Sequence, residues 1–162
     1  VNSILKTHYG SIFSNGKIVE DIPKGGRTYK NTMSADDCIR FLVALDNNQL
    51  PYSKEIRRLM SLPKRNRLYS GAHQIPSGTA IYSKSGSTNG NISDMGTLSA
   101  RGTNGQEYRY SIVAMFQRDH TMPDYRSFMR TRGNYIREIS NIAYSTIADT
   151  LYPLRKMAAK QK

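Results

Sequence analysis

The sequence predicts an α+β fold, an αβα sandwich in which an antiparallel sheet is covered by helices. Three observations lead to this prediction. Apolar residues recur at helical spacing in two N-terminal segments and in one long C-terminal segment. Three β-prone segments lie between them. The last two of these are joined by Thr103-Asn104-Gly105, a typical hairpin turn, so the strands are expected to pair antiparallel.

The first part of the chain, residues 1–33, is predicted to be mostly irregular. A short helix is expected over residues 2–9 and is stopped by Gly10. Turn signals follow at Asn15-Gly16 and across residues 23–26. This segment is therefore expected to form a long ordered loop that leads into a helix.

Two helices are predicted next. Ser34 is a favourable N-cap, and two acidic residues behind it suit the positive end of a helix dipole. This helix is expected to run to Asp46, with Cys38 on its apolar face as a buried structural thiol. Ser53 is expected to cap a shorter helix, which Pro63 stops.

Strands are expected at residues 79–85, 96–101 and 108–118. Both faces of the third strand are partly apolar, which predicts a central strand covered on both sides. A loop over 120–131 then precedes a long helix at 133–151. We expect three parts: 1–33, 34–152 as the main domain, and a basic tail at 153–162.

The bulk composition limits the classes of function. The 162 residues carry 24 Lys and Arg against 12 Asp and Glu, a net charge of +12, which attracts polyanions. No nucleic-acid motif accompanies the basic residues, so a basic nucleic-acid-binding domain is only an alternative. One cysteine excludes an internal disulfide, and three dispersed histidines predict neither a metal site nor a cofactor. No apolar run has the length of a membrane span.

The most informative motif is Lys84-Ser85-Gly86, followed by Ser87 and Thr88, at the end of the strand predicted at residues 79–85. It delivers an ammonium, hydroxyls and bare backbone N–H groups in succession. Such a strand edge can bind an anionic ligand that carries a carbonyl group. We call residues 84–88 the box.

The box and its surroundings resemble the C-terminal part of a serine β-lactamase or penicillin-binding protein, nearest to the class A type. The similarity covers roughly residues 22–151. Residues 22–28 resemble the exit of the family's Ω loop, and residues 31–37 the entry to the next helix. The box, a hairpin, a long strand and a terminal helix then follow in the family's order.

The resemblance implies acyl transfer through an acyl-enzyme, with a β-lactam or a D-alanyl peptide as substrate and an extracytoplasmic location. Lys84 would place its ammonium beside the substrate carboxylate and the hydroxyl that relays the proton. Ser85 would hydrogen-bond that carboxylate, and Gly86 would let the substrate lie against the strand. The backbone N–H of Ser87 would contribute to the oxyanion hole. Thr88 closes the expected substrate-binding segment.

The sequence also departs from the family pattern. Ser-x-x-Lys, which carries the family's nucleophile, occurs literally at residues 3–6, 14–17 and 61–64, but none has the required context. We therefore expect the nucleophile to lie on an N-terminal portion outside these residues, carried by a missing segment or a partner chain. Glu20 is the nearest acid to the deacylating glutamate of class A enzymes, and it is retained as a candidate base. A non-catalytic binding module on the same scaffold remains an alternative.

Overall fold

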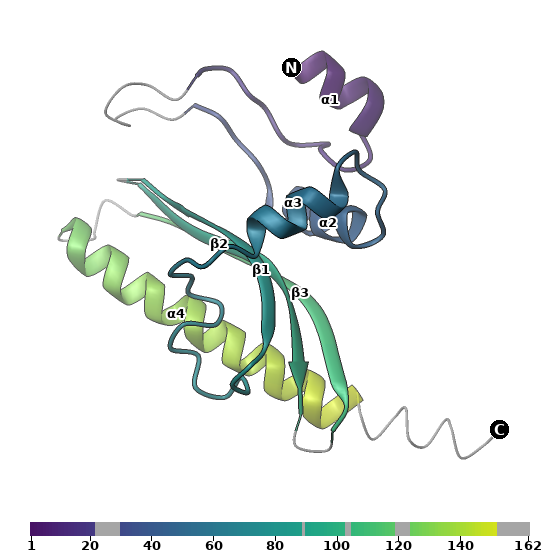
Figure 1. Ribbon diagram of the computed structural model, residues 1–162. Coiled ribbons are helices and arrows are strands. Elements are labelled where there is room, and N and C mark those ends of the chain that lie inside the picture. Colours follow the sequence, from purple (N-terminus) through teal and green to yellow (C-terminus); the bar gives the residue numbers. More distant parts are fainter. Residues whose placement is uncertain (22–29, 89, 103–104, 119–123, 152–162) are drawn as a thin grey trace.

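The computed structural model describes residues 1–21, 30–88, 90–102, 105–118 and 124–151 (Figure 1). A three-stranded antiparallel sheet lies between helices, so the α+β sandwich predicted from the sequence is confirmed. Along the chain, the elements are α1 (Asn2–Tyr9), α2 (Ala35–Asp46), α3 (Ser53–Met60), β1 (Ala80–Ser87), β2 (Asn91–Arg101), β3 (Glu107–Gln117), α4 (Tyr125–Thr146) and the π-helical turn η1 (Ile147–Leu151).

The sheet has an apolar core on each face, with α2 and α3 on one side and α4 on the other (Figure 1). Side chains alternate between the two faces along each strand. On the first face, Leu42 and Leu45 of α2 and Met60 of α3 pack with Tyr82 of β1. On the opposite face, β2 and β3 pack against α4 through residues that include Ile92, Leu98, Ile112, Phe128 and Ile136.

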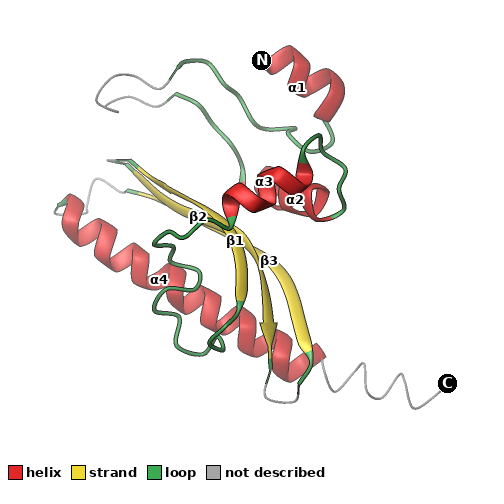
Figure 2. Cartoon of the chain, viewed as in Figure 1, coloured by secondary structure: helices red, strands yellow, loops and turns green. Residues whose placement is uncertain are grey.

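The long connection from α3 to β1 packs against α4 rather than extending into solvent (Figure 2). Leu68 is fully buried in the core beside α4, and its carbonyl accepts a hydrogen bond from the Ser140 hydroxyl at 2.6 Å. Arg137 Nε donates to the Ser70 carbonyl at 2.8 Å. These contacts hold the connection between α3 and β1 in place against α4.

The strand predictions need two corrections. β2 begins at Asn91 rather than at residue 96, because its polar first half pairs with the second half of β1 and with β3. The strand order is β1-β2-β3, so β2 is the central strand of the described sheet and β3 lies at an edge. Coverage of β3 on both faces is confirmed, since α2 and α4 both contact it.

Two helix starts also differ from prediction. The helix expected at 133–151 begins at Tyr125, because the Asp124 side chain caps it by accepting the Ser127 N–H at 2.6 Å. Ser53 does not cap α3. Its hydroxyl turns back to the Leu50 carbonyl at 2.7 Å, and Tyr52, with a φ of 58°, occupies the N-cap position.

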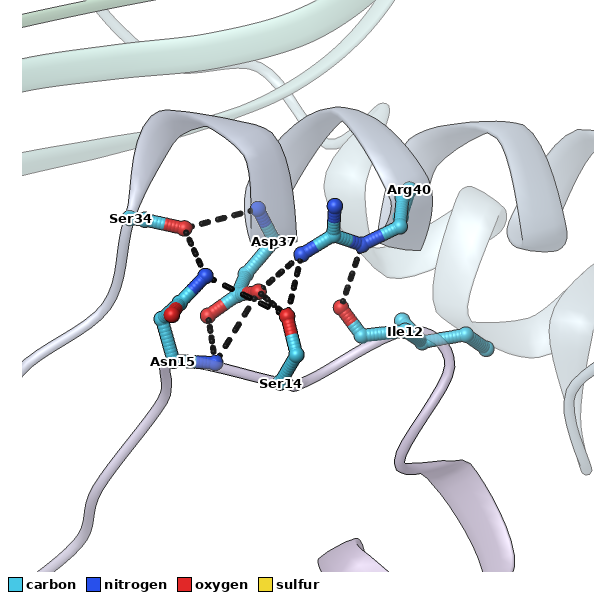
Figure 3. A network of polar contacts seen from close by, with 6 residues as sticks. All are labelled: Ile12, Ser14, Asn15, Ser34, Asp37 and Arg40. Atoms are coloured by element: carbon cyan, nitrogen blue, oxygen red, sulfur yellow. Dashed lines mark hydrogen bonds and ion pairs between the residues drawn. The ribbon is translucent and has the colours of Figure 1, made fainter.

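The start of α2 follows the prediction and holds the N-terminal segment in place (Figure 3). Ser34 caps the helix by accepting the Asp37 N–H at 3.1 Å. The fully buried Asp37 carboxylate accepts the Asn15 N–H at 3.1 Å and the Ser14 hydroxyl at 3.3 Å, and it forms an ion pair with Arg40. Burial alone would raise the pKa of the Asp37 carboxyl, but these hydrogen bonds outweigh burial and hold that pKa below its usual range.

Two other expectations concern the described residues. Cys38 is buried with 3% of its surface exposed, as predicted, and burial raises the pKa of its thiol. Within the described ranges, no helix combines the length and the apolar character needed to cross a membrane. The Ω-loop-like stretch at 22–28 and the whole basic tail at 153–162 lie outside these ranges.

Replacement of Asp37 by asparagine tests the N-terminal attachment. Asp37→Asn should lower the free energy of unfolding by about 2 kcal/mol at pH 7, because Arg40 loses its charged partner. The exposed neighbour offers a matched control: Asp36→Asn should cost less than about 1 kcal/mol. Urea denaturation measures both.

The pH dependence gives a second test of the same carboxylate. The Asp37 pKa is depressed in the folded state, so its contribution is present above the unfolded Asp pKa of about 3.9 and is lost as the pH falls through the folded value. The stability difference between wild type and Asp37→Asn should therefore shrink below about pH 4. An unchanged difference there would contradict the assignment.

Candidate active-site wall

The box lies at the end of an edge strand. Within the described ranges β1 pairs with β2 alone, so its other edge has no partner strand there. The register places Lys84 opposite Met95 and Ser85 opposite Asp94. Side-chain alternation therefore directs Lys84 to the face covered by α2 and α3, and directs Ser85 to the face covered by α4.

Lys84 has a second cation as a neighbour. Its side chain is exposed, and its ammonium donates to the Ser85 carbonyl. Lys64, on the connection from α3, donates to the Met60 carbonyl. Partial burial and repulsion from the Lys84 ammonium lower the pKa of Lys64, although Asp94 opposes this effect. Two lysines thus concentrate positive charge next to the box.

Ser85 lies beside a buried carboxylate. Its hydroxyl oxygen is buried and has no hydrogen-bond partner among the described residues, and the same holds for Asp94 Oδ1. The other Asp94 oxygen, Oδ2, accepts from Arg67 Nη1 at 3.1 Å and from the Arg67 backbone N–H at 3.3 Å. Asp94 is fully buried, whereas the Arg67 side chain is 19% exposed. The ion pair therefore joins the connection before β1 to the centre of the sheet.

Backbone direction at the end of β1 follows from one hydrogen bond. The Thr88 N–H donates to the Asn91 carbonyl at 2.9 Å and so points toward β2. Because successive peptide groups of a strand alternate in direction, the Ser87 N–H faces the free edge. The Ser87 hydroxyl accepts from Arg67 Nη2 at 3.3 Å, and the Thr88 hydroxyl accepts the Gly90 N–H at 3.2 Å.

Gly86 is required by its neighbour on β2. A Cβ atom at this position would lie 2.8 Å from Ser93 Oγ, closer than real Cβ contacts. A larger residue would displace the Ser93 side chain as well as cover the strand surface. The glycine therefore has a packing role in addition to the binding role that the sequence suggests.

The structure places the remaining candidates apart from the box or in other roles. Glu20 is half-buried, and its carboxylate accepts the Lys30 N–H at 2.5 Å. Ser3 is on α1, none of whose residues is buried. Ser14 binds Asp37, and the Ser61 hydroxyl donates to the Arg57 carbonyl at 2.8 Å at the end of α3. Among the described residues, no group of three or more His, Cys, Asp and Glu could hold a metal ion.

Sequence reasoning missed Asp94 and Lys64 as neighbours of the box. Asp94 falls between the strands predicted at 79–85 and 96–101, and nothing local links it to Arg67, which is 27 residues away. A single acid inside an otherwise uncharged stretch, residues 91–100, was the available signal. Lys64 belongs to a Ser-x-x-Lys match, but its proximity to Lys84 depends on how the connection folds.

Fold and edge strand define a class of protein: an α+β domain whose outer strand presents Lys-Ser-Gly. The chain belongs to the β-lactamase enzyme family, whose model (Beta-lactamase2) matches residues 1–147. It is therefore a member of the serine β-lactamase and penicillin-binding protein superfamily, as the sequence suggested. No curated protein matches the chain.

Two solved structures share the fold. PBP-A is 21% identical, with a TM-score of 0.68, and the alignment covers 91% of this chain and 51% of PBP-A. A point mutant of PBP-A, solved as an acyl-enzyme complex with penicillin G, is also 21% identical, with a TM-score of 0.62 over 83% of this chain and 47% of the mutant. The chain thus spans about half the length of these structures.

Removal of the buried carboxylate should destabilise the sheet. Asp94→Ala is expected to lower the free energy of unfolding by about 3 kcal/mol, because Arg67 loses its buried partner while staying mostly covered. The exposed residue Asp149 provides the control, with an expected loss below about 0.5 kcal/mol for Asp149→Ala. Equal losses in urea denaturation would rule out the structural role given to Asp94.

The two lysines are testable by NMR. Lys84→Met removes the neighbouring ammonium, so the pKa of Lys64 should rise toward its usual range. Lys54→Met, on the exposed surface of α3, should leave the pKa of Lys64 unchanged. Titration of the lysine side-chain methylene signals measures both variants. No rise in Lys84→Met would show that the two ammonium groups do not interact.

Proposed function

We propose that this chain supplies one wall of the active site of a serine hydrolase or acyltransferase acting on β-lactams or D-alanyl peptides. The box forms that wall. One observation carries the proposal: on a strand edge that has no partner strand among the described residues, Lys84 is exposed and the Ser87 N–H points outward. A cation and an outward N–H on one edge suit a substrate with a carboxylate and a reactive carbonyl.

The reaction is acyl transfer. A serine hydroxyl attacks the substrate carbonyl, the carbonyl carbon to nitrogen bond breaks, and the departing nitrogen takes the serine's proton. The Ser87 N–H would stabilise the negative charge that develops on the carbonyl oxygen. The loss of such a donor typically raises the barrier by about 3–4 kcal/mol. The attacking serine is proposed to lie outside these residues.

Charge near the box supports recognition of an anionic substrate. Lys64 and Lys84 repel one another, so an incoming carboxylate would relieve that repulsion. The Ser85 hydroxyl is buried on the other face, so it reaches a substrate only after a change of rotamer. Gly86 and Thr88 complete the proposed binding segment, and Glu20 is kept as the candidate base.

The proposal includes an organisation and a location. Residues 1–33 would form the Ω-loop-like segment, residues 34–152 the C-terminal part of the catalytic fold, and residues 153–162 a basic tail. Family resemblance supports an extracytoplasmic site of action. The missing wall would come from an N-terminal segment or a partner chain.

Labelling with fluorescent penicillin tests the proposal. The natural full-length protein should become covalently labelled, and Lys84→Ala in that protein should slow labelling at least tenfold, because the substrate carboxylate loses its cation. Lys54→Ala, which removes an exposed lysine on α3, should label like wild type. The 162-residue chain alone should stay unlabelled. Stoichiometric labelling of that chain would contradict a nucleophile outside these residues.

A non-catalytic binding module is the second candidate. None of the three Ser-x-x-Lys serines occupies a buried helix start: Ser3 is exposed, Ser14 binds Asp37, and Ser61 follows α3. If the full-length protein binds penicillin reversibly but is never labelled, the binding module is favoured over the enzyme.

A further inference from the structure

A second cationic site lies on the opposite face of the sheet from Lys84. It is a cavity of about 540 Å³ between α4 and the connection that precedes β1. This volume falls within the range of roughly 300–1,000 Å³ found for small-molecule sites. Its charged lining residues are all arginines: Arg65, Arg67, Arg130 and Arg137. We call this space and the four arginines that line it the arginine cavity.

Two of these arginines are held in fixed positions. Arg67 is bound by Asp94 and Ser87, and Arg137 donates to the Ser70 carbonyl and to Asn134 Oδ1 at 2.9 Å. Gly71 allows the close packing of Arg137, because a Cβ there would lie 3.0 Å from Arg137 Nε. The inner half of the cavity is therefore preorganised.

The other two arginines are available to a ligand. Arg65 and Arg130 are exposed, and the side chain of neither forms a hydrogen bond or an ion pair with another described residue. No acidic residue is among those that line the cavity, and Asp94 lies buried behind Arg67. Four guanidinium groups thus face one space with a single carboxylate to offset them.

We propose that the arginine cavity binds a compact ligand with adjacent phosphate groups, such as a diphosphate or triphosphate. Guanidinium groups bind phosphate oxygens through paired hydrogen bonds, and a diphosphate carries several negative charges in a small volume. One carboxylate could not neutralise this lining. The site requires no nucleophile and is independent of the proposed acyl transfer.

Calorimetric titration of the full 162-residue chain with pyrophosphate at 150 mM salt tests the proposal. We expect saturable binding of one pyrophosphate per chain, with orthophosphate weaker by about tenfold. Arg65→Gln and Arg130→Gln should each weaken binding roughly five- to tenfold, because each removes a charged hydrogen-bonding partner. Both residues are exposed, so neither change should affect folding.

The control has the same change in net charge. Arg101→Gln lies at the far end of β2, seven residues and about 23 Å along the strand from Asp94. It should leave pyrophosphate affinity unchanged. Equal weakening by Arg101→Gln and Arg130→Gln, or no saturable binding, would overturn the site in favour of a general charge effect.

Competing ligands identify the source of the phosphates. Tighter binding of ADP than of pyrophosphate would support a nucleotide ligand, and the reverse order would support an inorganic polyphosphate. An oligonucleotide or an acidic peptide that displaces pyrophosphate at lower concentration than either would overturn the proposal, because the cavity would then serve a macromolecule.

Discussion

The buried carboxylate of Asp94 is the interaction on which the arrangement of this domain depends. It sits on the central strand, opposite Ser85, and it binds both the backbone and the guanidinium of Arg67. The connection before β1 is thereby attached to the sheet, and the same connection packs on α4 through Leu68. A buried charge without its partner costs free energy of folding, so the pairing of Asp94 with Arg67 constrains where β1 can lie.

Two cationic regions lie on opposite faces of the sheet. Lys84 and Lys64 gather where α2 and α3 cover the sheet, whereas Arg67 turns toward α4 and joins the arginine cavity. Net charge alone indicated only an affinity for polyanions. The fold divides part of that charge between the two faces: Lys84 and Lys64 lie near a strand edge on one face, and four arginines line a partly open cavity on the other.

Local patterns were sufficient for α2 and for the burial of Cys38, because apolar spacing and the Ser34 cap act within a few residues. Local patterns failed where contacts with residues distant in the sequence determine the secondary structure. The first half of β2 lies before the strand predicted at 96–101, yet it pairs with β1 as a strand, and Arg67 forms an ion pair with its buried acid, Asp94. Gly133 marks the predicted helix start, although α4 begins eight residues earlier, at Tyr125, behind the Asp124 cap.

One edge of β1, which has no partner strand in the described part of the chain, connects stability with function. An unpaired edge exposes backbone N–H and C=O groups that invite pairing with another chain, and an exposed lysine such as Lys84 discourages that pairing. The same open edge leaves the Ser87 N–H available to a substrate carbonyl. A further strand added at this edge would occupy the N–H groups that acyl transfer requires. The proposed activity therefore requires that β1 remain an edge strand. The charge of Lys84 would both discourage pairing with another strand and bind the substrate carboxylate.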